Sequence, residues 1–255
     1  MSAIIETGTI RRRRLAKVET GKTGKTGKTE REEPLSVPYT MRYLDESYLE
    51  QVLDLQKIIC QYLPSSDLLQ PFAPDFMCQH VCNKGRIIGV FADQGLIAFR
   101  ALYFPDIDDH EWNLGFDIGL QESELAKVAN LQMVCVNPLY RGNQLGLKMN
   151  RHVIRFLKEE TDYIHLCATV HPRNHWNVKI LMKSGFVIRN LKEKYGGKLR
   201  YIVYQNLREP IKIMSKDKVF VKHMDIDEQK KVLKRGFLGI DLLESLQGFQ
   251  VVFAK

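Results

Sequence analysis

One stretch of this chain combines the residue types and the spacing that hold a phosphate group. Residues 130–136 alternate like a strand, and Asn137-Pro138 ends it because proline has no N–H for the ladder. The turn that follows reads Arg141-Gly142-Asn143-Gln144-Leu145-Gly146 and runs directly into an amphipathic helix. Such a turn directs several backbone N–H groups, and the positive end of the helix, at one point. The segment is therefore predicted to bind a phosphate or a diphosphate.

The elements on either side of this turn are predicted from side-chain periodicity. Alternation places Leu131, Met133 and Cys135 on one face of the strand, and Gln132, Val134 and Val136 on the other. The core-facing stripe of the helix comprises Met149, Val153, Phe156 and Leu157. Gly146, at the entrance of the helix, lets a ligand approach the backbone without meeting a Cβ atom.

A second segment continues this pattern downstream. Residues 163–170 alternate again and predict another strand. Asn174 suits the N-cap of the next helix, which carries Asn177 in its first turn, and Gly185 is the expected C-terminal stop.

These two segments, in this order, resemble the two signatures of the GNAT superfamily of acyl-CoA-dependent N-acyltransferases. The first signature, Arg/Gln-x-x-Gly-x-Gly/Ala, usually follows Pro-x-Tyr, and it is similar to residues 138–146 here. Gln144 stands where the first motif glycine is expected, so the N–H is kept while a Cβ narrows the approach and disfavours a positive φ. The second signature, Asn-x-x-Ser/Ala in a helix that closes on Gly-Phe, is similar to residues 174–186, with Asn177 replacing Ser or Ala.

The resemblance implies an N-acetyltransferase that uses acetyl-CoA as its acyl donor and needs no metal. An amine would attack the thioester directly, the N–H groups of Val134 and Val136 would stabilise the oxyanion, and Asn174 would bond the pantetheine arm. The implied cofactor-binding residues are Met133, Val134, Cys135, Val136, Arg141, Gly142, Asn143, Gln144, Leu145, Gly146, Leu147, Asn174 and Asn177.

The proton-transfer groups that are customary in this family are absent. Relatives place a tyrosine where this chain has Leu181, and often a glutamate where it has Gln132. We expect Glu111 and His110, in an acidic segment that attracts a cationic amine acceptor, or Tyr195, as a proton donor to sulfur, to act instead. Proton transfer by water and a loss of catalysis stay open.

Residues 1–37 are predicted to form a disordered basic tail. Arg11 to Arg14 and three Gly-Lys-Thr copies within 21–29 show no apolar periodicity, and the glycine spacing does not fit a Walker loop. The chain carries a net charge of +8, to which this tail contributes. A solvated extension is the simpler interpretation, and a salt-sensitive contact with nucleic acid is the alternative.

Cysteine usage and hydropathy predict a cytoplasmic protein. The five cysteines are an odd number without the spacing of a disulfide framework. Cys78-Gln79-His80-Val81-Cys82 groups three zinc-type ligands, but no second pair has the spacing that a tetrahedral site requires. No apolar run approaches the ~20 residues that span a bilayer, so no membrane association is expected.

The predicted fold class is α/β (α+β), with a mixed, largely antiparallel sheet flanked by helices. Residues 38–208 would form this GNAT-like domain. Residues 209–255 would add a small α/β extension, with strands at 219–222 and 249–253 and a helix that Asp225-x-x-Glu228 opens; it would pack on the core or on a second copy in a homodimer.

Three functions stay open at this point: an N-acyltransferase for a small or peptidic primary amine, an acyl-CoA-binding sensor or structural module without turnover, and a nucleic-acid- or ribosome-associated acetyltransferase tethered by the tail. The amine acceptor is not identified, because the loops at about 64–85 and 104–128 that would form its pocket carry no motif.

Overall fold

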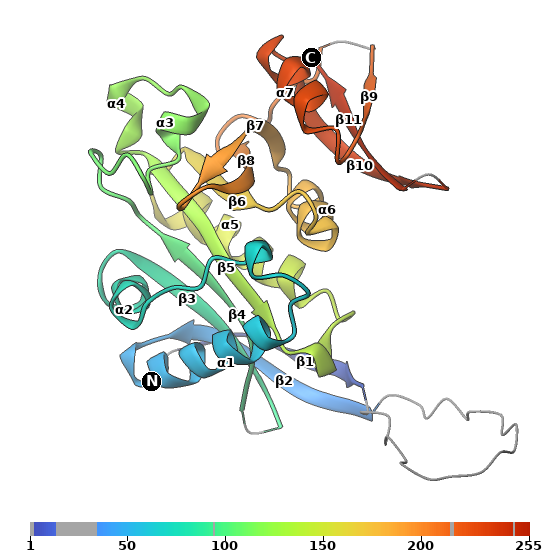
Figure 1. Ribbon diagram of the computed structural model, residues 1–255. Coiled ribbons are helices and arrows are strands. Elements are labelled where there is room, and N and C mark those ends of the chain that lie inside the picture. Colours follow the sequence, from blue (N-terminus) through green and yellow to red (C-terminus); the bar gives the residue numbers. More distant parts are fainter. Residues whose placement is uncertain (1–2, 14–34, 94, 215–216, 247) are drawn as a thin grey trace, which may run out of the picture.

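A computed structural model describes residues 3–13, 35–93, 95–214, 217–246 and 248–255. These residues form one eleven-stranded sheet in the order β1-β2-β3-β4-β5-β6-β8-β7-β10-β11-β9, with helices packed against it (Figure 1). The pair β5/β6 is parallel, and every other pair of neighbours in the described part is antiparallel. The prediction of a mixed, largely antiparallel sheet flanked by helices is confirmed.

The elements have the following bounds. The strands are β1 Ile4–Arg12, β2 Leu35–Leu44, β3 Gly85–Ala92, β4 Gly95–Tyr103, β5 Val128–Val136, β6 His165–Val170, β7 Val187–Lys194, β8 Lys198–Asn206, β9 Val219–Lys222, β10 Leu238–Ser245 and β11 Gly248–Ala254. The α-helices are α1 Leu49–Gln61, α2 Pro74–Cys82, α3 Gly115–Ile118, α4 Glu122–Leu125, α5 Leu145–Glu160, α6 His175–Lys183 and α7 Ile226–Lys234. Short 3-10 turns cover Glu46–Tyr48, Ser66–Leu68 and Pro138–Tyr140.

Apolar side chains bury both faces of the sheet. Met149, Val153 and Leu157 of α5 belong to the larger apolar cluster, called here the α5 cluster, as their spacing predicted. Val52 of α1 and Met77 of α2 belong to a second cluster on the other face, called here the α1/α2 cluster. Within the described residues, no helix combines the length and the apolar character that crossing a bilayer requires.

Strand β5 departs from the predicted alternation at a bulge. Its register against β4 shifts between Leu131 and Val134, so that Gln132 and Met133 together oppose a single residue of β4. The extra residue exchanges the faces of the strand: Leu131 lies in the α5 cluster, whereas Met133 and Cys135 lie in the α1/α2 cluster. The prediction of one common face for these three residues is therefore wrong for Leu131.

The predicted disordered tail is wrong for residues 4–12. These residues form β1, which pairs along its length with β2, and Ile10 is buried in the core. The tail prediction failed here because a strand gains its stability from a partner, and β2 is distant in sequence. The three Gly-Lys-Thr copies lie outside the described residues.

Glu6 fastens β1 to helix α5. Its carboxylate accepts hydrogen bonds from the hydroxyl of Tyr39, from Lys148 Nζ at 2.8 Å and from His152 Nε2 at 2.7 Å. Burial raises the pKa of Glu6, but these hydrogen bonds outweigh burial and lower the pKa from 4.5 to about 2. The contact therefore favours the folded chain only while Glu6 is ionised.

The C-terminal residues repeat the preceding β-α-β-β unit. In each unit a strand precedes a helix and two hairpin strands, and the third strand pairs between the other two, as β6-β8-β7 and as β9-β11-β10. Equivalent residues of the two units are separated by the same number of positions in the sequence. Asn174 and Asp225 cap the helices, Gly185 and Gly236 follow the helices with positive φ, and the hairpin irregularities begin at Ile188 and Gly239.

The two units pack through an approximate two-fold relation. Ile188 of β7 pairs with its own equivalent, Gly239 of β10, and each helix packs against a strand of the other unit, α6 against β10 and α7 against β7. The hydroxyl of Tyr201 in β8 donates to Gln229 Oε1 of α7 at 2.7 Å. The extension is thus packed on the core of its own chain, which is one of the two arrangements that the sequence left open.

We predict that Gly239→Ala destabilises the protein by about 1–3 kcal/mol, the usual cost of overpacking. A Cβ at this position would lie 2.8 Å from the Cβ of Ile188, so the two strands must separate. Urea denaturation measures the effect, with Gly95→Ala as the control because a Cβ there meets no atom within 4 Å. Equal stabilities of the two variants would contradict this packing.

We predict that Glu6→Gln flattens the acid-induced loss of stability. A folded-state pKa below the unfolded value stabilises the fold above pH 4.5, and that stabilisation disappears as the pH falls towards 2. Tm measured across this window should fall more steeply for the natural protein than for the variant. Glu50→Gln, which changes an exposed glutamate of α1, should keep the natural slope.

Candidate active site

The turn between β5 and α5 presents a row of unpaired backbone N–H groups. The first hydrogen bond of the helix runs from Lys148 N–H to Gln144 O, at 3.0 Å. The N–H groups of residues 142–147 have no acceptor in the described part of the chain. The first turn of α5 also contains no acidic residue. Free N–H groups at a helix N-terminus are complementary to an anion, which is the ligand that the sequence predicts here.

Two residues of the turn have the left-handed backbone that aims these groups. Gly142 has φ 92° and Gln144 has φ 57°. Gln144 thus adopts the conformation of the motif glycine that it replaces, at a cost of about 1–2 kcal/mol for a residue with a Cβ. The geometry of the turn is kept despite the substitution.

Asn143 holds the turn through its side chain. The amide accepts from Arg11 N–H at 2.9 Å, and Nδ2 donates to Arg11 O at 2.7 Å and to Tyr140 O at 2.9 Å. These bonds occupy the side-chain amide. What Asn143 offers a ligand is therefore its backbone N–H.

A cleft opens where β5 and β6 separate. The two strands pair only at Val128–Asn130 and His165–Cys167. Beyond these pairs the cleft is lined by Leu68, Leu69, Gln70, Phe72, Trp112, Leu114, Leu131, Gln132, Met133, Val134, Thr169, Val170, His171, Asn174, Asn177, Tyr195 and Arg200. The lining includes Met133, Val134, Asn174 and Asn177, four of the predicted cofactor-binding residues.

Two N–H groups of β5 point away from β4 in this region. Asn137 N–H, one residue beyond the end of β5, donates to Ile97 O of β4 at 2.8 Å and so points towards β4. Hydrogen-bonded and non-hydrogen-bonded pairs alternate in an antiparallel ladder, so the N–H groups of Val134 and Val136 face the side from which β6 has withdrawn. Both can donate a hydrogen bond to a group that lies between the two strands.

Gly146, in the first turn of α5, packs between β5 and α6. A Cβ at this position would lie 3.5 Å from Ile180 of α6 and 3.8 Å from Val134 of β5. Asn174 caps α6 by accepting from Asn177 N–H at 3.3 Å, which confirms the predicted N-cap. Asn177 Oδ1 is buried without a partner among the described residues, so an amide acceptor is available beside the cleft.

Cys135 is the predicted cofactor-strand residue that turns away from the cleft. It is fully buried in the α1/α2 cluster. Burial raises the pKa of its thiol far above the ordinary value, so it is not an activated nucleophile.

Tyr195 reaches the cleft from the turn between β7 and β8. Its ring stacks on Trp112 with the centroids 4.8 Å apart, and its hydroxyl lies 3.4 Å from Thr169 Oγ1. Burial chiefly raises the pKa of Tyr195 to about 12, with smaller contributions from the charges of Asp117 and Glu111. The phenol stays protonated at neutral pH and acts as a hydrogen-bond donor.

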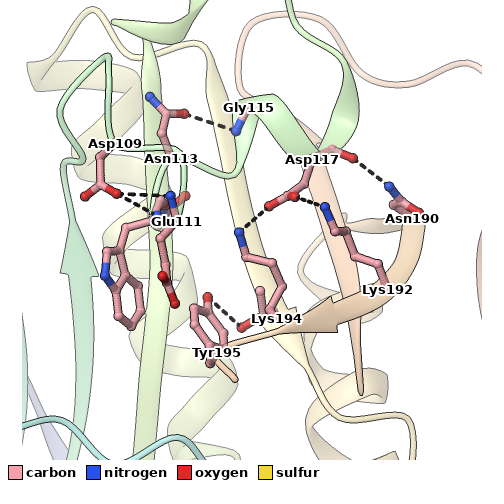
Figure 2. Close-up of polar contacts among 12 residues, drawn as sticks. Asp109, Glu111, Asn113, Gly115, Asp117, Asn190, Lys192, Lys194 and Tyr195 are labelled. Carbon is pink, nitrogen blue, oxygen red and sulfur yellow. Dashed lines mark hydrogen bonds and ion pairs between the residues drawn. The ribbon is translucent and has the colours of Figure 1, made fainter. Parts of the chain in front are cut away.

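Figure 2 shows how the segment before β5 meets this turn. Asp117 of α3 binds Lys192 Nζ at 2.7 Å and Lys194 Nζ at 2.9 Å, directly before Tyr195. Glu111 is exposed, and its backbone N–H donates to Asp109 Oδ1 at 3.2 Å.

Of the three predicted catalytic residues, only Tyr195 is in the cleft lining. His110 is exposed and packs on Phe116 with the ring centroids 4.2 Å apart. The structure therefore does not bring His110 and Glu111 together with Tyr195 at the cleft, although the charge of Glu111 acts on the Tyr195 phenol.

The fold brings further polar residues to this site, of which sequence reasoning missed Arg200. Arg200 and His171 line the cleft, and Gln132 Oε1 lies 2.6 Å from Nε2 of the buried His80. Burial lowers the pKa of His80. Burial also lowers the pKa of His171, and the charges of Arg200 and Arg173 lower it further. The isolated Arg200 carried no sequence signal; the cluster around His80 was considered only as a metal site.

We predict that Gln144→Gly keeps or raises Tm, whereas Gln144→Val lowers the stability by about 1–2 kcal/mol. Glycine adopts φ 57° without strain, and a β-branched side chain resists it. Thermal unfolding without ligand measures both variants. A fall in Tm for the glycine variant would contradict the left-handed turn.

Comparisons with known proteins bear on the fold. No family model matches the sequence, and no curated protein matches it. Solved structures that match include an N-acetyltransferase from Staphylococcus aureus Mu50 (13% identity, TM-score 0.50, 67% of this chain and 99% of that chain). The loading GNATL domain of CurA from Lyngbya majuscula also matches (12% identity, TM-score 0.50, 67% of this chain and 98% of that chain).

A third match is yncA from Salmonella typhimurium, solved with its cofactor acetyl-CoA (12% identity, TM-score 0.50, 69% of this chain and 98% of that chain). Each match spans nearly all of the solved chain and about two thirds of this one. The chain therefore has a GNAT-like fold, with about one third of its length outside the likeness.

Proposed function

We propose that the protein is an N-acyltransferase that moves the acetyl group of acetyl-CoA to a primary amine. The observation that carries this proposal is that a turn with unpaired N–H groups directly follows β5, the strand whose residues 131–134 line a cleft between two separating strands. A ligand that matches both parts has a diphosphate at one end and a thioester at the other. The fold likeness to acetyltransferases agrees with this assignment.

The residues would divide the work along the length of the donor. The N–H groups of residues 142–147 hold the diphosphate, and Asn174 and Asn177 flank the pantetheine arm. The thioester oxygen accepts hydrogen bonds from the N–H groups of Val134 and Val136. The neutral amine nitrogen attacks the thioester carbon and the carbon–sulfur bond breaks; the nitrogen then gives its surplus proton to solvent, and the departing thiolate takes up a proton from solvent to become the free thiol. Tyr195 donates a hydrogen bond to the departing sulfur.

No carboxylate belongs to the cleft lining in the described part of the chain. The ammonium proton of the acceptor is therefore lost to water, to the imidazole of His171, or to Glu111 through water, before the amine attacks. A reaction of this kind depends on the fraction of acceptor that is already neutral. Its rate rises with pH until the pKa of the amine is reached.

A second candidate function is acyl-CoA binding without turnover. Leu181, which stands where relatives have a tyrosine, is buried in the α5 cluster and makes no contribution to the cleft lining. Gln132 lines the cleft and is not a base. A sensor or structural module would bind acyl-CoA at the turn without catalysing acyl transfer.

We predict amine-dependent thiol release from acetyl-CoA, with kcat reduced roughly tenfold to a hundredfold by Tyr195→Phe at an unchanged Kd for acetyl-CoA. A panel of primary amines assayed from pH 6 to pH 10 by thiol detection, with calorimetry for Kd, tests this. Tyr62→Phe, at an exposed tyrosine, is the matched control.

The outcomes separate the candidates. Arg141→Glu should weaken acetyl-CoA binding, because it places a negative charge at the edge of the anion site. Binding without thiol release for every amine would support the binding module. No binding of acetyl-CoA by the natural protein would overturn both functions.

A further inference from the structure

Strand β1 lies against the anion-binding turn, although it belongs to the N-terminal segment before β2. Arg13 N–H donates to Leu139 O at 2.7 Å, and the backbone of Arg11 exchanges two hydrogen bonds with the side chain of Asn143. Glu6 anchors the other end of the strand on α5. Arg11 and Arg13 are therefore fixed beside the turn by their main chain.

Arg13 brings its charge to the turn. Its Nη2 is 3.4 Å from the position that a Cβ of Gly142 would occupy. Arg13 is exposed and has no ion pair within the described residues, whereas Arg12 pairs with Asp93 at 3.2 Å. A guanidinium with free donors thus stands next to the N–H groups that hold a diphosphate.

Coenzyme A carries a further phosphate that these N–H groups do not account for. Its 3′-phosphate is a monoester on the ribose that adjoins the diphosphate, and a phosphate monoester carries about −1.5 to −2 charge at pH 7. A guanidinium binds such a group through two parallel N–H donors. An arginine beside the diphosphate site is placed for this contact.

We propose that Arg13, which directly follows β1, binds the 3′-phosphate of coenzyme A, so that the N-terminal segment contributes to the choice between coenzyme A and its 3′-dephospho form. The inference rests on the proposed function, because it concerns the same donor. It assigns to the basic N-terminal run a ligand-binding role that local sequence motifs did not indicate.

Calorimetry with coenzyme A and with 3′-dephospho-coenzyme A tests the proposal on the full chain. The natural protein should bind coenzyme A about tenfold more tightly than the dephospho form, the effect of one charge-assisted hydrogen-bonded contact. Arg13→Ala should abolish most of this preference and leave the Kd of the dephospho form unchanged. Arg13→Lys should restore part of it, since the charge is kept without the paired donors.

The control is the double variant Lys222→Ala with Lys234→Ala, which removes exposed positive charge from the C-terminal unit and should keep the full preference. Equal Kd values of the natural protein for both ligands, or an unchanged preference in Arg13→Ala, would overturn the role of Arg13 alone. If neither ligand binds the natural protein, the proposed function itself fails. Loss of single-stranded DNA binding in Arg13→Ala, with the ligand preference intact, would assign the run to nucleic acid instead.

Discussion

Backbone groups left without partners between β5 and α5 are the constraint on which the rest of this structure depends. A helix that follows a strand through a turn leaves its first N–H groups unpaired, and here the turn adds those of Gly142 and Asn143 to them. Side-chain capping would satisfy such groups, but no side chain caps α5. The row is complementary to an anion. Gln144 adopts the strained φ of 57° within this turn.

Strand β5 leads from the cleft to this turn, and a bulge divides the strand into two halves with different partners. The first half pairs with β6, and the second half, after Gln132 and Met133, pairs with β4 alone. Arg100 Nη1 donates to Gln132 O at 2.8 Å from within the core, and burial lowers the pKa of Arg100 to about 9. The Gln132 side chain meets His80 on the other face of the sheet. The bulge is thus held from both faces, which fixes where the cleft begins.

Local signals predicted much of this fold, and long-range pairing accounts for most of what they missed. The stripe of α5 and the caps Asn174 and Asp225 are contained in a few neighbouring residues, and all were confirmed. β1 and β10 are strands because β2 and β11 lie beside them, which no window of sequence shows. Leu131 was assigned to the wrong face because a bulge adds one residue without changing the hydrophobic pattern. Tyr195 enters the cleft through the β7–β8 turn, and the cleft position of Arg200 likewise follows from strand order alone.

The repeated C-terminal unit shows which part of the fold makes the site. It keeps the capped helix, the glycine at its end and the irregular hairpin of the first unit. Its first strand, β9, is the last strand of the sheet and has no parallel neighbour from which to separate. The described residues before β9 contain no turn like that of residues 141–146, whereas the proposed site combines a diverging strand pair with a helix start that has unpaired N–H groups. Within the described residues the second unit therefore covers the edge of β7, protecting it from pairing with other chains, and forms no second site.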